Sequence, residues 1–133
     1  MTVEELLAEA RRTLIRLEPH AAAAAMRDGA VLVDVRDGRQ VMRDGVVPGA
    51  VYHPRNVLEW RADPSCAYRD PRIADPAVRL IVMCHEGYQS SLAAATLQRL
   101  GLPLATDLIG GFVAWRAAGL PVRHPGEVAG GRF

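Results

Sequence analysis

The fold can be inferred from one stretch, LIVMCHEGYQSSLAAATLQRLG, which spans residues 80–101. It opens with a continuous apolar run that ends at Cys84, passes through a polar loop that contains Gly87, and becomes rich in alanine and leucine before a second glycine. Continuous apolar runs are typical of strands buried on both faces, and Ser90 or Ser91 is a suitable N-cap for a helix. The stretch therefore predicts a buried strand, a tight loop and a helix.

The alternation of strands and helices continues on both sides of this stretch. Apolar runs predict further strands, and alanine-rich or amphipathic segments between them predict helices. The expected strands are AVLVDV (30–35), AVYH (50–53) and ATDLI (105–109), and the expected helices are 1–17, one that begins at Pro19, 39–43 and FVAWRAA (112–118). The proline-rich residues 56–79 are expected to form a structured loop. We predict an α/β fold with a central parallel sheet of about five strands, flanked by helices on both faces.

Length and charge limit the classes of protein that fit. The 133 residues are expected to form a single domain, with a flexible tail at 124–133. Sixteen basic and fifteen acidic side chains leave a net charge of +1, so neither nucleic acid nor a membrane surface is an expected partner. No apolar run approaches the roughly 20 residues that cross a bilayer. An amino terminus without a secretory pattern leads us to expect a cytoplasmic protein with free thiols at Cys66 and Cys84.

Cys84 is the candidate nucleophile of the chain. It ends a predicted parallel strand, where ligands bind in sheets of this kind. The tight loop before a helix directs several backbone N–H groups inward, and the positive end of the helix dipole adds to their attraction for an anion. Such surroundings lower a cysteine pKa from about 8.5 to between about 3.5 and 7.5. The alternative is a buried cysteine that only packs, and the strand–loop–helix arrangement favours the nucleophile.

The loop CHEGYQSS resembles the active-site loop of rhodanese-family sulfurtransferases, which Cys84, Gly87 and Ser90 match. Three further segments resemble that family in the same order along the chain. They are VLVDVR (31–36), GVVPGA (45–50), beside the family's GHIPGA, and LIGGFVAWRAAGLPV (108–122). The resemblance extends from about Glu18 to Val122, and it implies a rhodanese-like, single-domain sulfurtransferase.

The resemblance also implies a chemistry and a set of site residues. The Cys84 thiolate would take a sulfane sulfur from a donor such as thiosulfate, hold it as a persulfide, and pass it to cyanide, a small thiol or a protein thiol. No metal or organic cofactor is implied. The persulfide-binding loop would comprise His85, Glu86, Gly87, Tyr88, Gln89 and Ser90, with Asp34 and Arg36 in supporting roles.

One departure from the family pattern concerns the donor. Gln89 stands where many members have arginine or lysine, and Glu86 adds a negative charge, so the loop has no cation of its own to bind a dianion. Thiosulfate is therefore only one candidate among the possible sulfur donors. Arg36, Arg55 and Arg61 are candidates for the missing charge, although Arg36 is equally expected to pair with an acidic group as a structural residue.

Three alternatives compete with sulfur transfer. A cysteine-dependent phosphatase needs an arginine six residues after the cysteine, where Ser90 stands, and a loop that is one residue longer. A non-catalytic rhodanese-like module would bind partners or sense oxidation through Cys84. A metal site is not expected, because the histidines lack the spacing of zinc ligands. These scattered histidines are His20, His53, His85 and His124.

Overall fold

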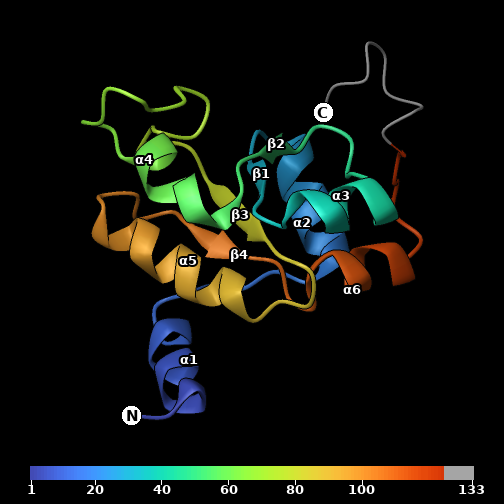
Figure 1. Ribbon diagram of the computed structural model, residues 1–133, viewed down its shortest axis with the longest axis horizontal. Coiled ribbons are helices and arrows are strands. Elements are labelled where there is room, and N and C mark those ends of the chain that lie inside the picture. Colours follow the sequence, from blue (N-terminus) through green and yellow to red (C-terminus); the bar gives the residue numbers. More distant parts are fainter. Residues whose placement is uncertain (125–133) are drawn as a thin grey trace.

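The computed structural model describes residues 1–124, and a parallel sheet lies at its centre (Figure 1). The strands are β1 (Val31–Asp34), β2 (Val51–Tyr52), β3 (Leu80–Met83) and β4 (Thr106–Asp107). Their order across the sheet is β2-β1-β3-β4, and every neighbouring pair is parallel. The predicted parallel α/β sheet is confirmed, but the described residues form four strands and not five.

Helices cover both faces of the sheet, as predicted (Figure 1). They are α1 (Val3–Arg11), α2 (Pro19–Arg27), α3 (Gly38–Asp44), α4 (Leu58–Ala62), α5 (Gln89–Arg99) and α6 (Gly111–Ala117), with a 3-10 turn η1 (Arg55–Val57). Side chains alternate along β3, as they must in a strand. Leu80 and Val82 pack in a core with α4 and α5, whereas Ile81 and Met83 pack in a second core with α2 and α6. A strand buried in this way explains the continuous apolar run.

The first helix is shorter than the predicted 1–17, because it ends at Arg11. Residues 12 and 13 form a turn, and the chain then reaches the sheet. There the N–H of Leu17 donates to the oxygen of Asp107 at 3.1 Å, and the N–H of Ile109 donates to the oxygen of Leu17 at 2.8 Å. Leu17 thus forms one parallel bridge beside β4, with Leu108 as its partner. Pairing with the sheet edge ends the helix and places this segment where a fifth strand would lie.

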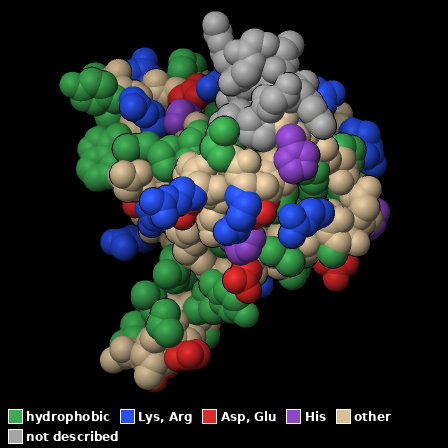
Figure 2. All heavy atoms as spheres, turned by 45° about the vertical axis from the view of Figure 1, so that its right-hand side comes forward, with side chains coloured by type: hydrophobic (Ala, Val, Ile, Leu, Met, Phe, Trp, Pro, Cys, Tyr) green, Lys and Arg blue, Asp and Glu red, His purple; other side chains and the backbone are tan. Residues whose placement is uncertain are grey.

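The helix α1 projects from the rest of the molecule and contacts mainly α5 (Figures 1 and 2). The side chain of Thr2 caps it by accepting a hydrogen bond from the N–H of Glu5 at 3.1 Å. None of its residues is fully buried, and Val3 and Leu6 are 65% and 42% exposed. Figure 2 shows hydrophobic side chains on this arm. The arm therefore reaches the carboxyl side of the sheet without joining either core.

Residues 56–79 form α4 and the ordered loop that follows it. Ile73 is fully buried, and the carboxylate of Asp70 accepts hydrogen bonds from Arg72 and lies 2.8 Å from Nε2 of His53. The prediction of a structured loop is therefore confirmed for residues 63–79, whereas residues 58–62 are helical. Of the tail expected at 124–133, all but the first residue lies outside the described residues. Within residues 1–124, no helix is long and apolar enough to cross a membrane.

Candidate active site

Cys84 directly follows β3 and is only 2% exposed. The alternation along β3 points its side chain into the core that α5 covers. The backbone N–H of Gly87 donates a hydrogen bond to Sγ of Cys84 at 3.1 Å. Gly87 has φ +88°, a left-handed conformation that glycine adopts without steric cost. The loop thus folds back far enough to aim a backbone donor at the sulfur.

The loop ends where α5 begins, at Gln89, with Tyr88 in the N-cap position. The side chain of Tyr88 makes no capping hydrogen bond. The expectation that Ser90 or Ser91 caps the helix is wrong, because both residues lie inside it and their hydroxyls donate to Oδ2 of Asp107 at 2.8 Å and 2.7 Å. These buried hydroxyls hold the first turn of α5 against β4.

The start of α6 supports the same loop from the other side. The N–H of Phe112 donates to the oxygen of Cys84 at 2.9 Å, and the N–H of Val113 donates to the oxygen of His85 at 3.1 Å. Gly111 permits this approach, because an added Cβ would lie 2.6 Å from both of these carbonyl oxygens. The loop therefore has its backbone held by two helices, α5 and α6.

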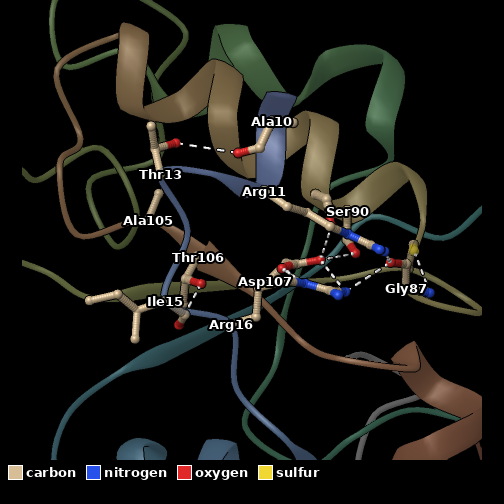
Figure 3. A network of polar contacts seen from close by, with 12 residues as sticks. Ala10, Arg11, Thr13, Ile15, Arg16, Gly87, Ser90, Ala105, Thr106 and Asp107 are labelled. Carbon is tan, nitrogen blue, oxygen red and sulfur yellow. Dashed lines mark hydrogen bonds and ion pairs between the residues drawn. The ribbon is translucent and has the colours of Figure 1, made fainter. Parts of the chain in front are cut away.

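Two arginines that the sequence analysis missed also bind the loop (Figure 3). The Nη2 atoms of Arg11 and Arg16 donate to the oxygen of Gly87 at 2.9 Å and 3.0 Å. Arg16 also forms an ion pair with Asp107, 2.8 Å from Nε to Oδ1. Asp107 could have been found as an acidic residue inside the predicted strand 105–109, where a buried charge needs a partner. The two arginines carry no comparable signal, because their position depends on how the residues before Leu17 pack on the sheet.

The ring of His85 faces a carboxylate. Its Nδ1 lies 4.0 Å from Oδ2 of Asp44. The hydrogen bonds from Arg43 lower the pKa of Asp44 most, followed in smaller measure by its coulombic attraction and that of Arg116. Asp44 is therefore a stable negative charge beside the loop. Because the His85 side chain is 25% exposed, its ring lies at the rim of the site.

The remaining loop side chains point outward. Glu86, Tyr88 and Gln89 are exposed. Tyr88 and Gln89 line a surface depression together with Val3 and Leu7 of α1. The side chain that stands in the place of the family's basic residue thus lies toward the projecting helix.

Asp34 and Arg36 form a buried ion pair at the end of β1. Nε and Nη2 of Arg36 donate to the two carboxylate oxygens of Asp34 at 3.0 Å and 2.8 Å, and Nη2 also donates to the oxygen of Gly45 at 2.8 Å. The guanidinium carbon lies 4.0 Å from the centre of the Phe112 ring. Since Phe112 also binds the oxygen of Cys84, Arg36 supports the loop indirectly, as a structural partner of an acidic group.

The other candidate cations are engaged away from the loop. Arg55 pairs with Glu59 at 2.8 Å, and Arg61 donates to the oxygen of Tyr68 at 3.0 Å. Both cysteines are free, and Sγ of Cys66 accepts from the N–H of Tyr68 at 3.4 Å. Across residues 1–124, no three His, Cys, Asp or Glu side chains are grouped so that they could hold a metal ion.

The fold and the loop define a class of protein, the rhodanese-like domains. Residues 18–118 match the family described as Rhodanese-like domain, and the chain belongs to that family. The rhodanese-like α/β fold predicted from the sequence is thereby confirmed.

Particular relatives agree over nearly their whole length. Thiosulfate sulfurtransferase GlpE of Actinobacillus pleuropneumoniae is 31% identical over 111 residues, which are 83% of this chain and 94% of that protein. Thiosulfate sulfurtransferase GlpE of Pseudomonas entomophila is 33% identical over 117 residues, which are 87% of this chain and 93% of that protein. These relatives and the family support a rhodanese-type sulfurtransferase function for the chain.

A solved structure is similar over almost the whole chain. It is a protein of unknown function from Rhodopseudomonas palustris, described as a possible tyrosine phosphatase. The two share 35% identity with a TM-score of 0.85, over 92% of this chain and 95% of that one. The likeness covers a larger share of the chain than residues 18–118, which the family match spans.

Proposed function

We propose that this protein transfers a sulfane sulfur through a persulfide on Cys84. The observation that carries the proposal is the hydrogen bond from the N–H of Gly87 to the sulfur of Cys84, 3.1 Å long. A sulfur that already accepts a backbone donor, in a loop that leads into a helix N-terminus, is prepared to carry negative charge. The names of the relatives supply the reaction type.

The transfer takes two displacements. The Cys84 thiolate attacks the outer sulfur of the donor, and a new S–S bond forms as the donor's own bond breaks. With thiosulfate, sulfite leaves with the bonding electron pair. A nucleophilic acceptor then attacks the outer sulfur of the persulfide, and the electron pair of that S–S bond returns to Cys84. The electrons balance without an oxidant, so we propose no metal or organic cofactor.

The charges of the loop side chains affect which sulfur donor the protein can bind. Gln89 is uncharged and Glu86 is negative, so neither side chain attracts a dianion such as thiosulfate. Binding of an anion to the loop therefore relies on backbone N–H groups and on charge outside residues 85–90. A donor with a smaller charge, such as mercaptopyruvate, fits these side chains better.

Mass spectrometry of the loop peptide tests the proposal. The protein is incubated with thiosulfate and, separately, with mercaptopyruvate, and the peptide that contains Cys84 is examined for one added sulfur. Cys84→Ser should abolish the added mass, whereas Cys66→Ser should leave it unchanged. No added sulfur with either donor would contradict sulfur transfer and favour the alternative, a non-catalytic module that binds partners or senses oxidation.

Tyrosine phosphatase activity is the second candidate, because the similar Rhodopseudomonas palustris protein is described as a possible tyrosine phosphatase. The position six residues after Cys84 is Ser90, which is fully buried and bound to Asp107. A serine held in this way cannot supply the guanidinium that a phosphate cradle needs. We expect no hydrolysis of p-nitrophenyl phosphate under conditions in which the persulfide forms.

We also propose the setting in which the protein acts. Residues 1–133 act as one domain in the cytoplasm, with a small sulfur-containing donor and a thiol as acceptor, a protein thiol among the candidates. The two free thiols fit a reducing compartment. Co-incubation of the persulfide form with a reduced protein thiol would show whether the sulfur moves to it.

A further inference from the structure

Two guanidinium groups from the amino-terminal segment share one carbonyl oxygen of the Cys84 loop. The Nη2 atoms of Arg11 and Arg16 lie 2.9 Å and 3.0 Å from the oxygen of Gly87, and Figure 3 shows them converging on it. Both arginines precede residue 18, where the family match begins. The contact therefore comes from a part of the chain that the family match leaves out.

Each arginine is also fixed by its own surroundings. Arg16 donates from Nε and Nη2 to the two oxygens of the fully buried Asp107 at 2.8 Å and 3.2 Å. Arg11 stands in the last turn of α1 and donates from Nε to Oγ of Ser91 at 3.0 Å, with its guanidinium carbon 5.9 Å from the centre of the Tyr88 ring. Both side chains are thus held in place before they bind the loop, so little further ordering is needed.

The bound oxygen belongs to the peptide unit between Gly87 and Tyr88. In a trans peptide the C=O and the following N–H point in opposite directions, so the arginines that hold this oxygen also fix the direction of the Tyr88 N–H. The preceding N–H, that of Gly87, is the group that donates to Sγ of Cys84. The two arginines therefore hold the part of the backbone that contacts the sulfur.

The charges at this position do not cancel. Arg11 and Arg16 bring two positive charges, and Asp107 supplies one negative charge. Two like charges that share one oxygen repel each other, so part of the stabilisation from these hydrogen bonds is offset. A surplus positive charge remains at the Gly87 oxygen. Other charged groups near the loop include the exposed carboxylate of Glu86 and the carboxylate of Asp44, which lies 4.0 Å from the His85 ring.

We propose that Arg11 and Arg16 are positioning residues that supply positive charge to a loop with no cation of its own. They hold the peptide between Gly87 and Tyr88, and their charge stabilises the thiolate and the persulfide of Cys84 from behind the backbone. They do not touch the donor. This inference rests on the proposed function, since it concerns the same thiolate, but the reactivity of a thiol can be measured without any sulfur donor.

The test follows alkylation of Cys84 by iodoacetamide against pH, in a Cys66→Ser background. Arg11→Gln removes one charge and leaves the buried Asp107 with its arginine. We expect alkylation at pH 7 to slow about threefold to tenfold and the pH profile to move to higher pH, because a partly screened charge near the thiolate is lost. Arg11→Lys keeps the charge and should restore most of the rate.

Arg12→Gln is the matched control. Arg12 is the next residue, carries the same charge, and its side chain makes no hydrogen bond or ion pair with any part of residues 1–124. The rate of Cys84 alkylation in Arg12→Gln should depend on pH as it does in the parent protein. Circular dichroism checks the fold of each variant, and Arg11→Met, an uncharged side chain that is unbranched and a good helix former, replaces Arg11→Gln if that variant does not fold.

The outcomes separate this inference from the proposed function. If the profiles of Arg11→Gln and Arg12→Gln coincide, the positioning role is overturned, even where a persulfide forms on Cys84. If Arg11→Gln moves the profile while no donor yields a persulfide, the positioning role stands and the proposed sulfur transfer fails.

Discussion

Gly111 lies against the first carbonyl groups of the Cys84 loop, so closely that an added Cβ would stand 2.6 Å from the oxygen of Cys84. Gly111→Ala should therefore displace the loop. Because a displacement of about 1 Å at a reacting group can cost about 100-fold in rate, we expect a loss of that order in sulfur transfer to cyanide. Steady-state formation of thiocyanate measures it.

Gly119→Ala is the control for that substitution. Gly119 has φ +76° and Gly111 has φ +62°, so both variants bear a similar backbone penalty of about 1 to 2 kcal/mol, but an added Cβ at Gly119 meets no atom within 4 Å. The rate of thiocyanate formation by Gly119→Ala should stay near that of the parent protein. Equal rates in the two variants would mean that the close approach of α6 does not position the loop.

Gln89→Arg should raise the rate with thiosulfate. An arginine at the start of α5 would add a bidentate donor for an anion at the loop. We expect an increase of about tenfold in kcat/KM for thiosulfate, with a smaller change for mercaptopyruvate because that donor carries less charge. Gln89→Met, which changes the same side chain without adding a charge, is the control and should leave the thiosulfate rate near that of the parent protein. An unaltered thiosulfate rate in Gln89→Arg would show that the chain binds the anion without a cation at 89.

Arg36→Met should destabilise the fold strongly. The substitution leaves the carboxylate of Asp34 buried and unpaired, since the side chains of the pair are 0% and 2% exposed. Loss of one partner from a buried pair costs about 3 to 5 kcal/mol in the free energy of unfolding. Urea denaturation measures this. Arg55→Met removes the partly exposed pair with Glu59 and should cost only about 0.3 to 0.5 kcal/mol. Similar losses in the two variants would contradict the structural role of Arg36.

Asp70 should make the stability of the protein depend on pH. Hydrogen bonds from Arg72, and in smaller measure from His53, hold the pKa of Asp70 well below its usual range. A carboxyl group whose pKa is lower in the folded state stabilises that state above its unfolded pKa, near 4, and this contribution fades as the pH falls further. Asp70→Asn should therefore cost about 1 kcal/mol at pH 7 and progressively less below pH about 4.

Urea denaturation of Asp70→Asn and the parent protein at a series of pH values checks this dependence. Asp28→Asn serves as the control, because the side chain of Asp28 makes no hydrogen bond or ion pair within residues 1–124. A destabilisation of Asp70→Asn that stays constant from pH 7 to pH 3 would contradict the assigned ion pairs.

The sheet could be predicted because its strands are marked locally. The apolar run that ends at Cys84 and the one that ends near Asp34 both became strands, and Gly87 marked the turn that brings a backbone donor to the sulfur. Each of these signals lies within a few neighbouring residues. Local patterns of this kind decide secondary structure and the position of a strand-end site.

The parts that were missed depend on contacts between distant residues. Ser90 and Ser91 looked like helix caps, but Asp107 takes both hydroxyls. The periodicity up to Leu17 suggested one helix, but pairing with β4 ends it early and brings Arg16 to the loop. No spacing in the sequence indicates such a pairing, because it is decided by the edge of the assembled sheet.

The measurement that bears most directly on sulfur transfer through Cys84 is a single-turnover experiment. The protein is incubated with the donor, the excess donor is removed, and cyanide is added. The amount of thiocyanate released per chain is then compared with the mass that the intact protein loses when cyanide is added. We predict one sulfur per loaded chain, released completely as thiocyanate, and none from Cys84→Ser. Thiocyanate that forms equally with Cys84→Ser, or loaded sulfur that cyanide does not remove, would contradict the mechanism.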